Sequence, residues 1–156
     1  MSSKRNEILQ YLKNTVLANI TTGNGYNFTL ATKERGLKHY QDLVDSEFPA
    51  VFIASADEDR KNASTKNFTS VMTVYFIGYV KADTAFTVQQ ELDKLIEDLT
   101  NALYDGATVG ASDPTHGGKV SWTDVKKVET DEGDNEPHAM FKMLVEFGYK
   151  RTGTSS

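Results

Sequence analysis

The stretch NFTSVMTVYFIGYV at residues 67–80 decides the fold, because it predicts a β-strand that is apolar on both sides. Successive side chains leave a strand toward opposite faces of its sheet. One face would carry Phe68, Met72, Val74, Phe76 and Val80, and the other Val71, Tyr75, Ile77 and Tyr79. A strand with one face in water alternates apolar and polar residues, so something must cover the second face here.

The last apolar stretch, MFKMLVEFGYK at residues 140–150, alternates like a strand with one wet face. Its core face would carry Phe141, Met143, Val145, Phe147 and Tyr149, and its other face Lys142, Glu146 and Lys150. The aliphatic and Phe face of residues 67–80 should join this core. The face with two tyrosines then lies outside as an apolar patch, which is typical of protein contacts. The candidate protein interface therefore consists of Val71, Tyr75, Ile77 and Tyr79.

Two segments have the periodicity of helices that bury one face. Residues 3–20 repeat apolar side chains every four positions, at Ile8, Leu12, Val16 and Ile20. The second segment has apolar side chains at Val88, Leu92, Leu95, Ile96, Leu99 and Leu103. We expect Thr87 and Gln90 to form a capping box at its start and Gly106 to end it. The exposed face of this helix should bear Asp93, Glu97 and Asp98.

Shorter elements complete the predicted fold. A short helix with Leu37, Tyr40, Leu43 and Val44 should end before Pro49, and strands are expected at 50–55 and 120–128. Residues 55–67 and 105–118 predict long polar connections. Two main helices plus the short one, packed against a mainly antiparallel sheet, form an α+β two-layer sandwich. The 156 residues fit a single domain, 1–156, with a polar C-terminal tail at 151–156.

The charge of the chain argues against nucleic acid as a tightly bound partner. Lys and Arg total 17 against 22 Asp and Glu, which gives a net charge of −5. The segment TDEGDNEPH at 130–138 contains Asp131, Glu132, Asp134 and Glu136 without a Lys or Arg. Proteins that grip DNA present a basic patch that displaces counterions from phosphates, and the scattered cations of this sequence predict none.

No stretch of the sequence predicts export or a membrane span. The start MSSKRNEILQYLKN lacks the apolar run of a signal peptide, and nowhere do about 18 apolar residues follow one another. The chain has no cysteine, which excludes disulfides and thiolate metal sites and favours a reducing compartment. We therefore expect a soluble protein that is made in the cytoplasm.

The sequence lacks the motifs of common catalytic and cofactor sites. His39, His116 and His138 do not have metal-ligand spacing and are expected to be solvated, and neither a Gly-x-Ser-x-Gly elbow nor a P-loop occurs. Gly23 and Gly25 precede a strand-like alternation rather than a helix, so they predict a turn and not a phosphate cradle. We expect no enzyme activity, cofactor or metal. Sequence alone leaves open a Ser, His and Asp triad that is assembled in space.

A family resemblance rests on the order and spacing of several short pieces between about residues 4 and 150. In order they are RNEILQYLKNTVLANI, Gly25 with Tyr26, ERG, FPAVFI followed by an acidic stretch, TVYFIGYV, LDKLIEDLTNALYDG and LVEFGYK. In this arrangement the chain resembles the tail terminator proteins of long-tailed bacteriophages, relatives of the lambda minor tail protein that stops tail growth. Residues 55–67 and the loop DGATVGASDPTHGG match no motif of that family.

The resemblance implies a virion structural protein that assembles with itself as a ring, usually of six, on the head-proximal end of the tail tube. Such a ring blocks further addition of tail tube subunits and meets the neck or head-completion protein. Genomic DNA passes through its opening without specific binding. The residues Asp131, Glu132, Asp134 and Glu136 then form a candidate acidic lumen, since favourable contacts would slow the DNA.

Two alternatives to a tail terminator remain open. One is another neck or tail-tube component. The other, from a different class of protein, is a small-molecule-binding or enzymatic α+β domain.

Overall fold

The central strand of the sheet is β3 (Asn67–Lys81), the stretch that is apolar on both sides. It pairs in antiparallel fashion with β2 (Ala50–Asn62) and β5 (His138–Thr152). β5 also pairs with the antiparallel β4 (Trp122–Thr130), whereas β1 (Thr32–Arg35) runs parallel to β2. The result is a five-stranded mixed sheet in the order β1-β2-β3-β5-β4. The computed structural model describes residues 4–62, 67–82, 85–105, 115–116, 119–131 and 138–152.

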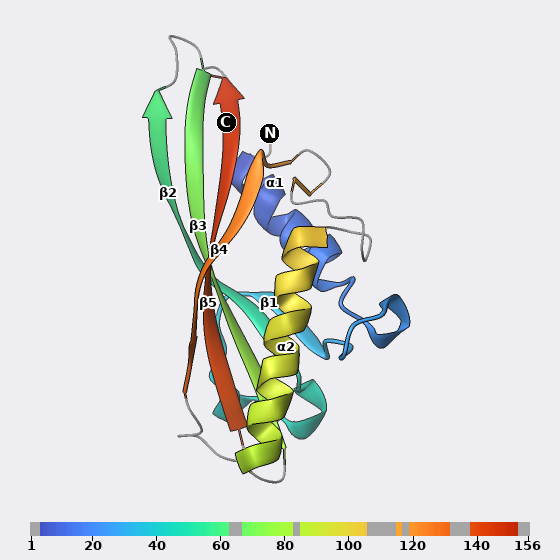
Figure 1. The fold of residues 1–156 in the computed structure, drawn as a ribbon. Helices are drawn as coiled ribbons and strands as arrows, with labels where there is room; N and C mark the ends of the chain where they lie inside the picture. Colours follow the sequence, from blue (N-terminus) through green and yellow to red (C-terminus); the bar gives the residue numbers. More distant parts are fainter. Residues whose placement is uncertain are drawn as a thin grey trace.

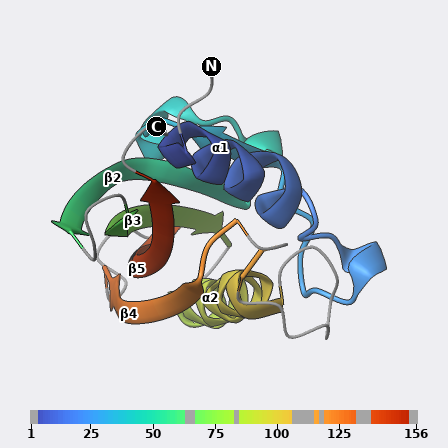
Figure 2. The ribbon, with the colours of Figure 1, turned by 90° about the horizontal axis from the view of Figure 1, so that it is seen from above.

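Two helical segments pack on one face of this twisted sheet (Figure 1, Figure 2). α1 (Lys4–Tyr11) continues into a π-helical segment, η1 (Leu12–Leu17), and α2 (Ala85–Asp105) follows β3. The 21 residues of α2 span about 32 Å and the 15 residues of β3 about 50 Å, so α2 alone covers only part of the sheet. α1 and η1 lie beside the remaining part (Figure 1). The predicted α+β two-layer sandwich is confirmed.

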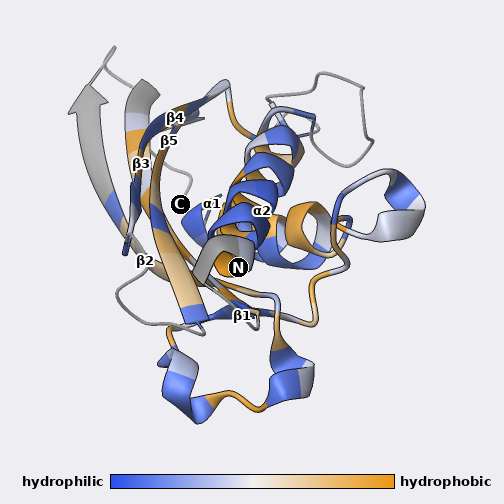
Figure 3. Cartoon of the chain, turned by 60° about the horizontal axis from the view of Figure 1, so that its bottom comes forward, coloured by the Kyte–Doolittle hydropathy of each residue, from blue (hydrophilic) through white to orange (hydrophobic). Residues whose placement is uncertain are grey.

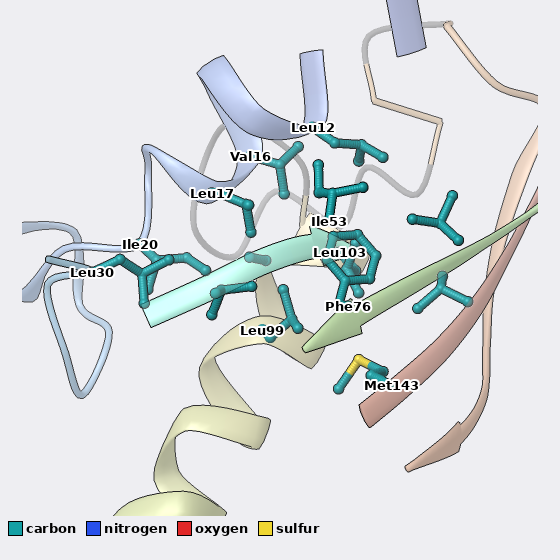
Figure 4. Packing of buried hydrophobic residues seen from close by; sticks show 14 of the residues in the cluster. Leu12, Val16, Leu17, Ile20, Leu30, Ile53, Phe76, Leu99, Leu103 and Met143 are labelled. Carbon is teal, nitrogen blue, oxygen red and sulfur yellow. The ribbon is translucent and has the colours of Figure 1, made fainter. Parts of the chain in front are cut away.

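The apolar stripes of both helices meet the inner face of the sheet in one core (Figure 4). Leu12, Val16 and Leu17 come from η1, and Leu99 and Leu103 from α2. The strands contribute Val51, Ile53, Met72, Val74, Phe76, Val80, Phe141, Met143, Val145, Phe147 and Tyr149. The alternation of the β3 and β5 sequences therefore predicted the core face correctly at these positions. Phe68, assigned to the same face, is outside the residues whose side chains are described.

Asp98 is a buried carboxylate, so the prediction that it lies on the exposed face of its helix is wrong. It is 1% exposed, and its two carboxylate oxygens accept hydrogen bonds from the backbone N–H groups of Asn27 and Phe28, each at 2.9 Å. These bonds fix the segment that leads into β1 against α2, and residues 26–30 are not a strand. Burial raises the pKa of Asp98, and the hydrogen bonds from Asn27 and Phe28 offset part of that rise.

Two predicted boundaries of the helices differ from the structure. The N-terminal helix ends at Leu17 and not at residue 20, although Ile20 is buried as its periodicity predicts. α2 begins at Ala85, so Thr87 lies inside the helix and does not cap it. Gly106 lies outside the described residues.

The segments before and after the first long strand also differ from the prediction. β2 continues to Asn62, so most of the polar connection expected at 55–67 is strand, paired with β3. The short helix expected from Leu37 onward is instead two single 3-10 turns, η3 (Tyr40–Asp42) and η4 (Asp45–Glu47). Both turns are polar, and the link between them is apolar (Figure 3). β1 was not predicted, because a strand of sequence TKER lacks an apolar face.

Candidate protein interface

The outer face of the sheet, opposite the helices, is covered by the chain itself at one end. Residues 39–48, which contain η3 and η4 and which we call the cover segment, lie over this end. Leu43 of the cover segment joins a second apolar cluster with Ala50, Phe52, Ile77 and Tyr79 of the sheet. Tyr40, Phe48, Ala54 and Met140 pack against that cluster. The cover segment therefore buries the outer face of β3 at Ile77 and Tyr79.

Aromatic contacts and one ion pair hold the cover segment on the sheet. The Tyr40 ring centroid lies 5.9 Å from that of Tyr79 and 4.9 Å from that of His138. The Phe48 ring lies 5.3 Å from the His138 ring, and Lys81 forms an ion pair with Asp45. Burial lowers the pKa of His138, Lys81 lowers it further, and Asp45 acts in the opposite direction.

The other end of the outer face is open. Tyr75 lies opposite Leu144 in the register of β3 and β5, and both side chains are partly exposed. The Lys142 Nζ lies 4.6 Å from the centroid of the Tyr75 ring, a cation–π contact. These residues and Lys127 and Glu129 of β4 line a shallow hollow of about 240 Å³.

Trp122 belongs to the same open end, on the far side of Gly148 from β3. Val71 and Trp122 both face Gly148 in the register, from β3 and β4 respectively. A Cβ placed on Gly148 would lie only 2.1 Å from Trp122 Nε1, so the indole rests directly on the glycine backbone. Trp122 remains 38% exposed. We call Val71, Tyr75, Trp122 and Leu144 the open strip.

The sequence-predicted interface is therefore divided between two environments. Ile77 and Tyr79 are 6% and 2% exposed beneath the cover segment, so the expectation that they lie on an outer surface is wrong. Val71 and Tyr75 belong to the open strip. The sequence-based interface did not include Leu144, which interrupts a polar face, or Trp122. Only the pairing register brings these side chains together.

The candidate acidic lumen lies mostly outside the described residues. Asp131 directly follows β4, and its backbone N–H donates to the Met140 carbonyl at 3.2 Å. Glu132, Asp134 and Glu136 belong to the undescribed residues 132–137. The acidic residues occur where the chain passes from β4, at one edge of the sheet, into β5.

The opposite edge of the sheet gathers cations, which the sequence had not predicted. A groove of about 850 Å³ runs along β1, and its lining includes Lys13, Lys33, Arg35 and Lys38 together with Glu34 and Glu47. Lys13 and Glu34 form an ion pair at 3.3 Å, and Arg35 donates to the Asn6 side chain at 2.9 Å. Among the described residues, no acidic group lies within ion-pair distance of Lys33 or Lys38.

The histidines occupy three different environments. His116 is 1% exposed and packs against the rings of Tyr11 and Phe147, so the expectation that it is solvated is wrong. His138 is half-buried under the cover segment, and His39 is exposed. Within the described ranges, no cluster of three or more His, Asp or Glu residues could hold a metal ion.

Comparison with known proteins adds no family assignment, because no family model and no curated protein matches the chain. Among the helices described here, none has the length and apolar character needed to cross a membrane.

Proposed function

We propose that the chain is a virion structural protein that caps the head-proximal end of a phage tail tube. In this proposal identical copies form a ring of six, end the polymerisation of tail tube subunits and present a surface to the neck or head-completion protein. The open strip carries the proposal, because it leaves a tryptophan and a tyrosine partly exposed on a sheet face whose other end the chain covers itself.

The chemistry of the open strip suits contact with another protein. Trp and Tyr are enriched among the residues that contribute most to protein binding, and they contribute most where surrounding contacts exclude water. Lys126 lies between Asp124 and Glu146, at 2.8 and 3.6 Å, and Lys127 pairs with Glu129 at 2.8 Å. The strip therefore has a rim of ion pairs, so a partner surface can cover the apolar centre without having to supply opposite charges of its own.

The net charge is consistent with a passage for DNA. Six copies at −5 each would give the ring a net charge of −30, which repels phosphates. The DNA backbone is then not retained. Non-specific binding to DNA is driven by counterions that leave the phosphates when basic side chains replace them.

The test is complementation of a phage that lacks the protein, with Tyr75→Glu as the variant. Tyr75 is partly exposed, so the variant should fold, but a charge in the contact should prevent capping and give tubes of uncontrolled length or tails without heads. Asp93→Lys, on the exposed face of α2, is the matched control and should cap normally. Normal tails with folded Tyr75→Glu, or wild-type protein located away from the head-proximal end of the tail, would refute the proposal.

A further inference from the structure

The groove along β1 has a positive balance on a molecule of negative net charge. Its lining carries four cations, Lys13, Lys33, Arg35 and Lys38, against the two acids Glu34 and Glu47. Lys13 is already neutralised by Glu34, and Arg35 is engaged with the uncharged Asn6. Lys33 and Lys38 are thus two positive charges at one edge of the sheet, without an acidic partner among the described residues.

The strand at the opposite edge of the same sheet is followed in the sequence by a run of negative charges. β4 is the last strand in the order β1-β2-β3-β5-β4, and the chain between β4 and β5 contains Asp131, Glu132, Asp134 and Glu136 without a cation. Three strands separate β4 from β1. The groove and Asp131, the residue at which the acidic segment begins, therefore lie at opposite edges of the sheet of one protomer.

We infer that the groove along β1 binds the acidic segment 131–136 of a second copy of this chain. The contact rests on the ring of our proposed function and names its subunit interface. Lys33 and Lys38 supply the charges that select the segment, and the paired Lys13 and Glu34 form the wall of the groove. Close charge pairs of this kind set the register and suppress wrong partners.

A contact between opposite edges has a geometric consequence. Because the two surfaces differ and belong to opposite edges, the interface is head-to-tail, and a contact between two copies leaves the groove of one and the acidic segment of the other for further copies. Repeated head-to-tail contacts close into a ring or extend as a filament. Placing the acidic segment in this interface removes it from the lumen, so the two locations for Asp131, Glu132, Asp134 and Glu136 are distinguishable.

The first test is a zero-length carbodiimide cross-link between amines and carboxylates in a mixture of unlabelled and ¹⁵N-labelled protein, with tail tubes as a template in a parallel sample. Peptides that contain Lys33 or Lys38 should be joined to the 131–136 peptide with mixed isotope labels. The Lys13–Glu34 pair, 3.3 Å apart within one chain, is the internal control and should give no mixed label. Links between copies that omit the groove, or protein that stays monomeric in both samples, would overturn the inference.

The second test exchanges the charges. Lys33→Glu with Lys38→Glu, and separately Glu132→Lys with Glu136→Lys, should each weaken self-association at least about tenfold at low salt. The protein with all four substitutions should assemble again, because both edges are reversed. Asp93→Lys with Lys94→Glu, on the exposed face of α2, is the control and should assemble like wild type.

The outcomes separate the interface from the proposed function. Rings that form through the groove but do not cap tails would support the inference and refute the tail-capping function. Rings of unchanged stability in the reversed variants would overturn the inference and leave capping intact. Rings of the Glu132→Lys, Glu136→Lys protein that assemble normally but retain duplex DNA would place the acidic segment at the lumen and also overturn the inference.

Discussion

At the scale of single residues, Asp98 shows how a charged side chain can serve the core. Its carboxylate accepts hydrogen bonds from the backbone N–H groups of Asn27 and Phe28 and so satisfies two partly buried donors. The segment before β1 owes its position on α2 to these bonds. An apolar residue at this position would leave both donors without a partner.

Replacement of Asp98 should therefore destabilise the fold. We expect Asp98→Ala to lower the free energy of unfolding by about 1–3 kcal/mol, because two partly buried backbone donors lose their acceptor and a buried side chain is truncated. Asp93→Ala, on the exposed face of the same helix, should change it by less than about 0.5 kcal/mol. Urea unfolding at pH 7 measures both, and equal effects of the two substitutions would show that the Asp98 bonds do not matter.

The raised pKa of Asp98 also predicts the sign of a pH effect. A carboxyl with a higher pKa in the folded than in the unfolded chain binds a proton on folding. The contribution of Asp98 to the free energy of unfolding is therefore full below the unfolded pKa of about 3.9 and is lost as the pH rises through the folded pKa. The stability of wild type relative to Asp98→Asn should thus be greatest at low pH and decline toward neutrality, as urea unfolding across that range would show. A constant difference contradicts this assignment.

Aromatic rings pack directly on the backbone of two glycines, on opposite faces of the sheet. A Cβ on Gly78 would meet the buried Phe141 ring at 2.0 Å, and one on Gly148 would meet Trp122 at 2.1 Å. Phe141 is 0% exposed and cannot move aside, whereas Trp122 can turn toward solvent. We expect Gly78→Ala to cost about 2–3 kcal/mol and Gly148→Ala less than about 1 kcal/mol in thermal unfolding. Comparable losses would mean that the Trp122 ring is as rigidly held as Phe141.

At the scale of elements, the cover segment packs on the ring of a titratable residue, His138. Because the pKa of His138 is lower in the folded protein, its contribution to stability is full above the unfolded pKa of about 6.5 and is lost as the pH falls through the folded pKa. The groups that face it are Lys81 on β3 and Asp45 and Tyr40 on the cover segment.

Mild acid should therefore loosen this end of the sheet. Between pH 7.5 and 5.5 the free energy of unfolding of wild type should fall more than that of His138→Phe, which keeps the ring contacts and cannot take up a proton. Urea titrations at the two pH values provide the measurement. An equal fall in both proteins would show that His138 does not report on the cover segment.

The elements that sequence predicted are those with a regular apolar pattern, which is one-sided in α2 and β5 and two-sided in β3. α2, β3 and β5 follow from periodicity, because helix and strand periods place their apolar side chains on one core. β1 and the second half of β2 have polar sequences and become strands only by pairing with a neighbour. The division of the outer face depends on the cover segment, which reaches the sheet through tertiary contacts that no local pattern encodes.

At the scale of the whole molecule, the charge is negative overall but unevenly distributed. The groove cations are few and partly neutralised, so we expect no measurable binding to duplex DNA at physiological salt. Fluorescence anisotropy with a labelled duplex tests this. Tight binding that weakens steeply with salt and disappears in the Lys33→Glu, Lys38→Glu protein would instead make the groove a site for phosphates.

Trp122 is the only tryptophan in the chain, and it rests on Gly148 with 38% of its surface exposed. The emission of an indole shifts to shorter wavelength when water around it is displaced, and a dissolved quencher then reaches it less often. The molecule thus carries an intrinsic optical label on the open strip. A titration with tail tubes followed in that emission would show when this sheet face is occupied, without attaching any dye.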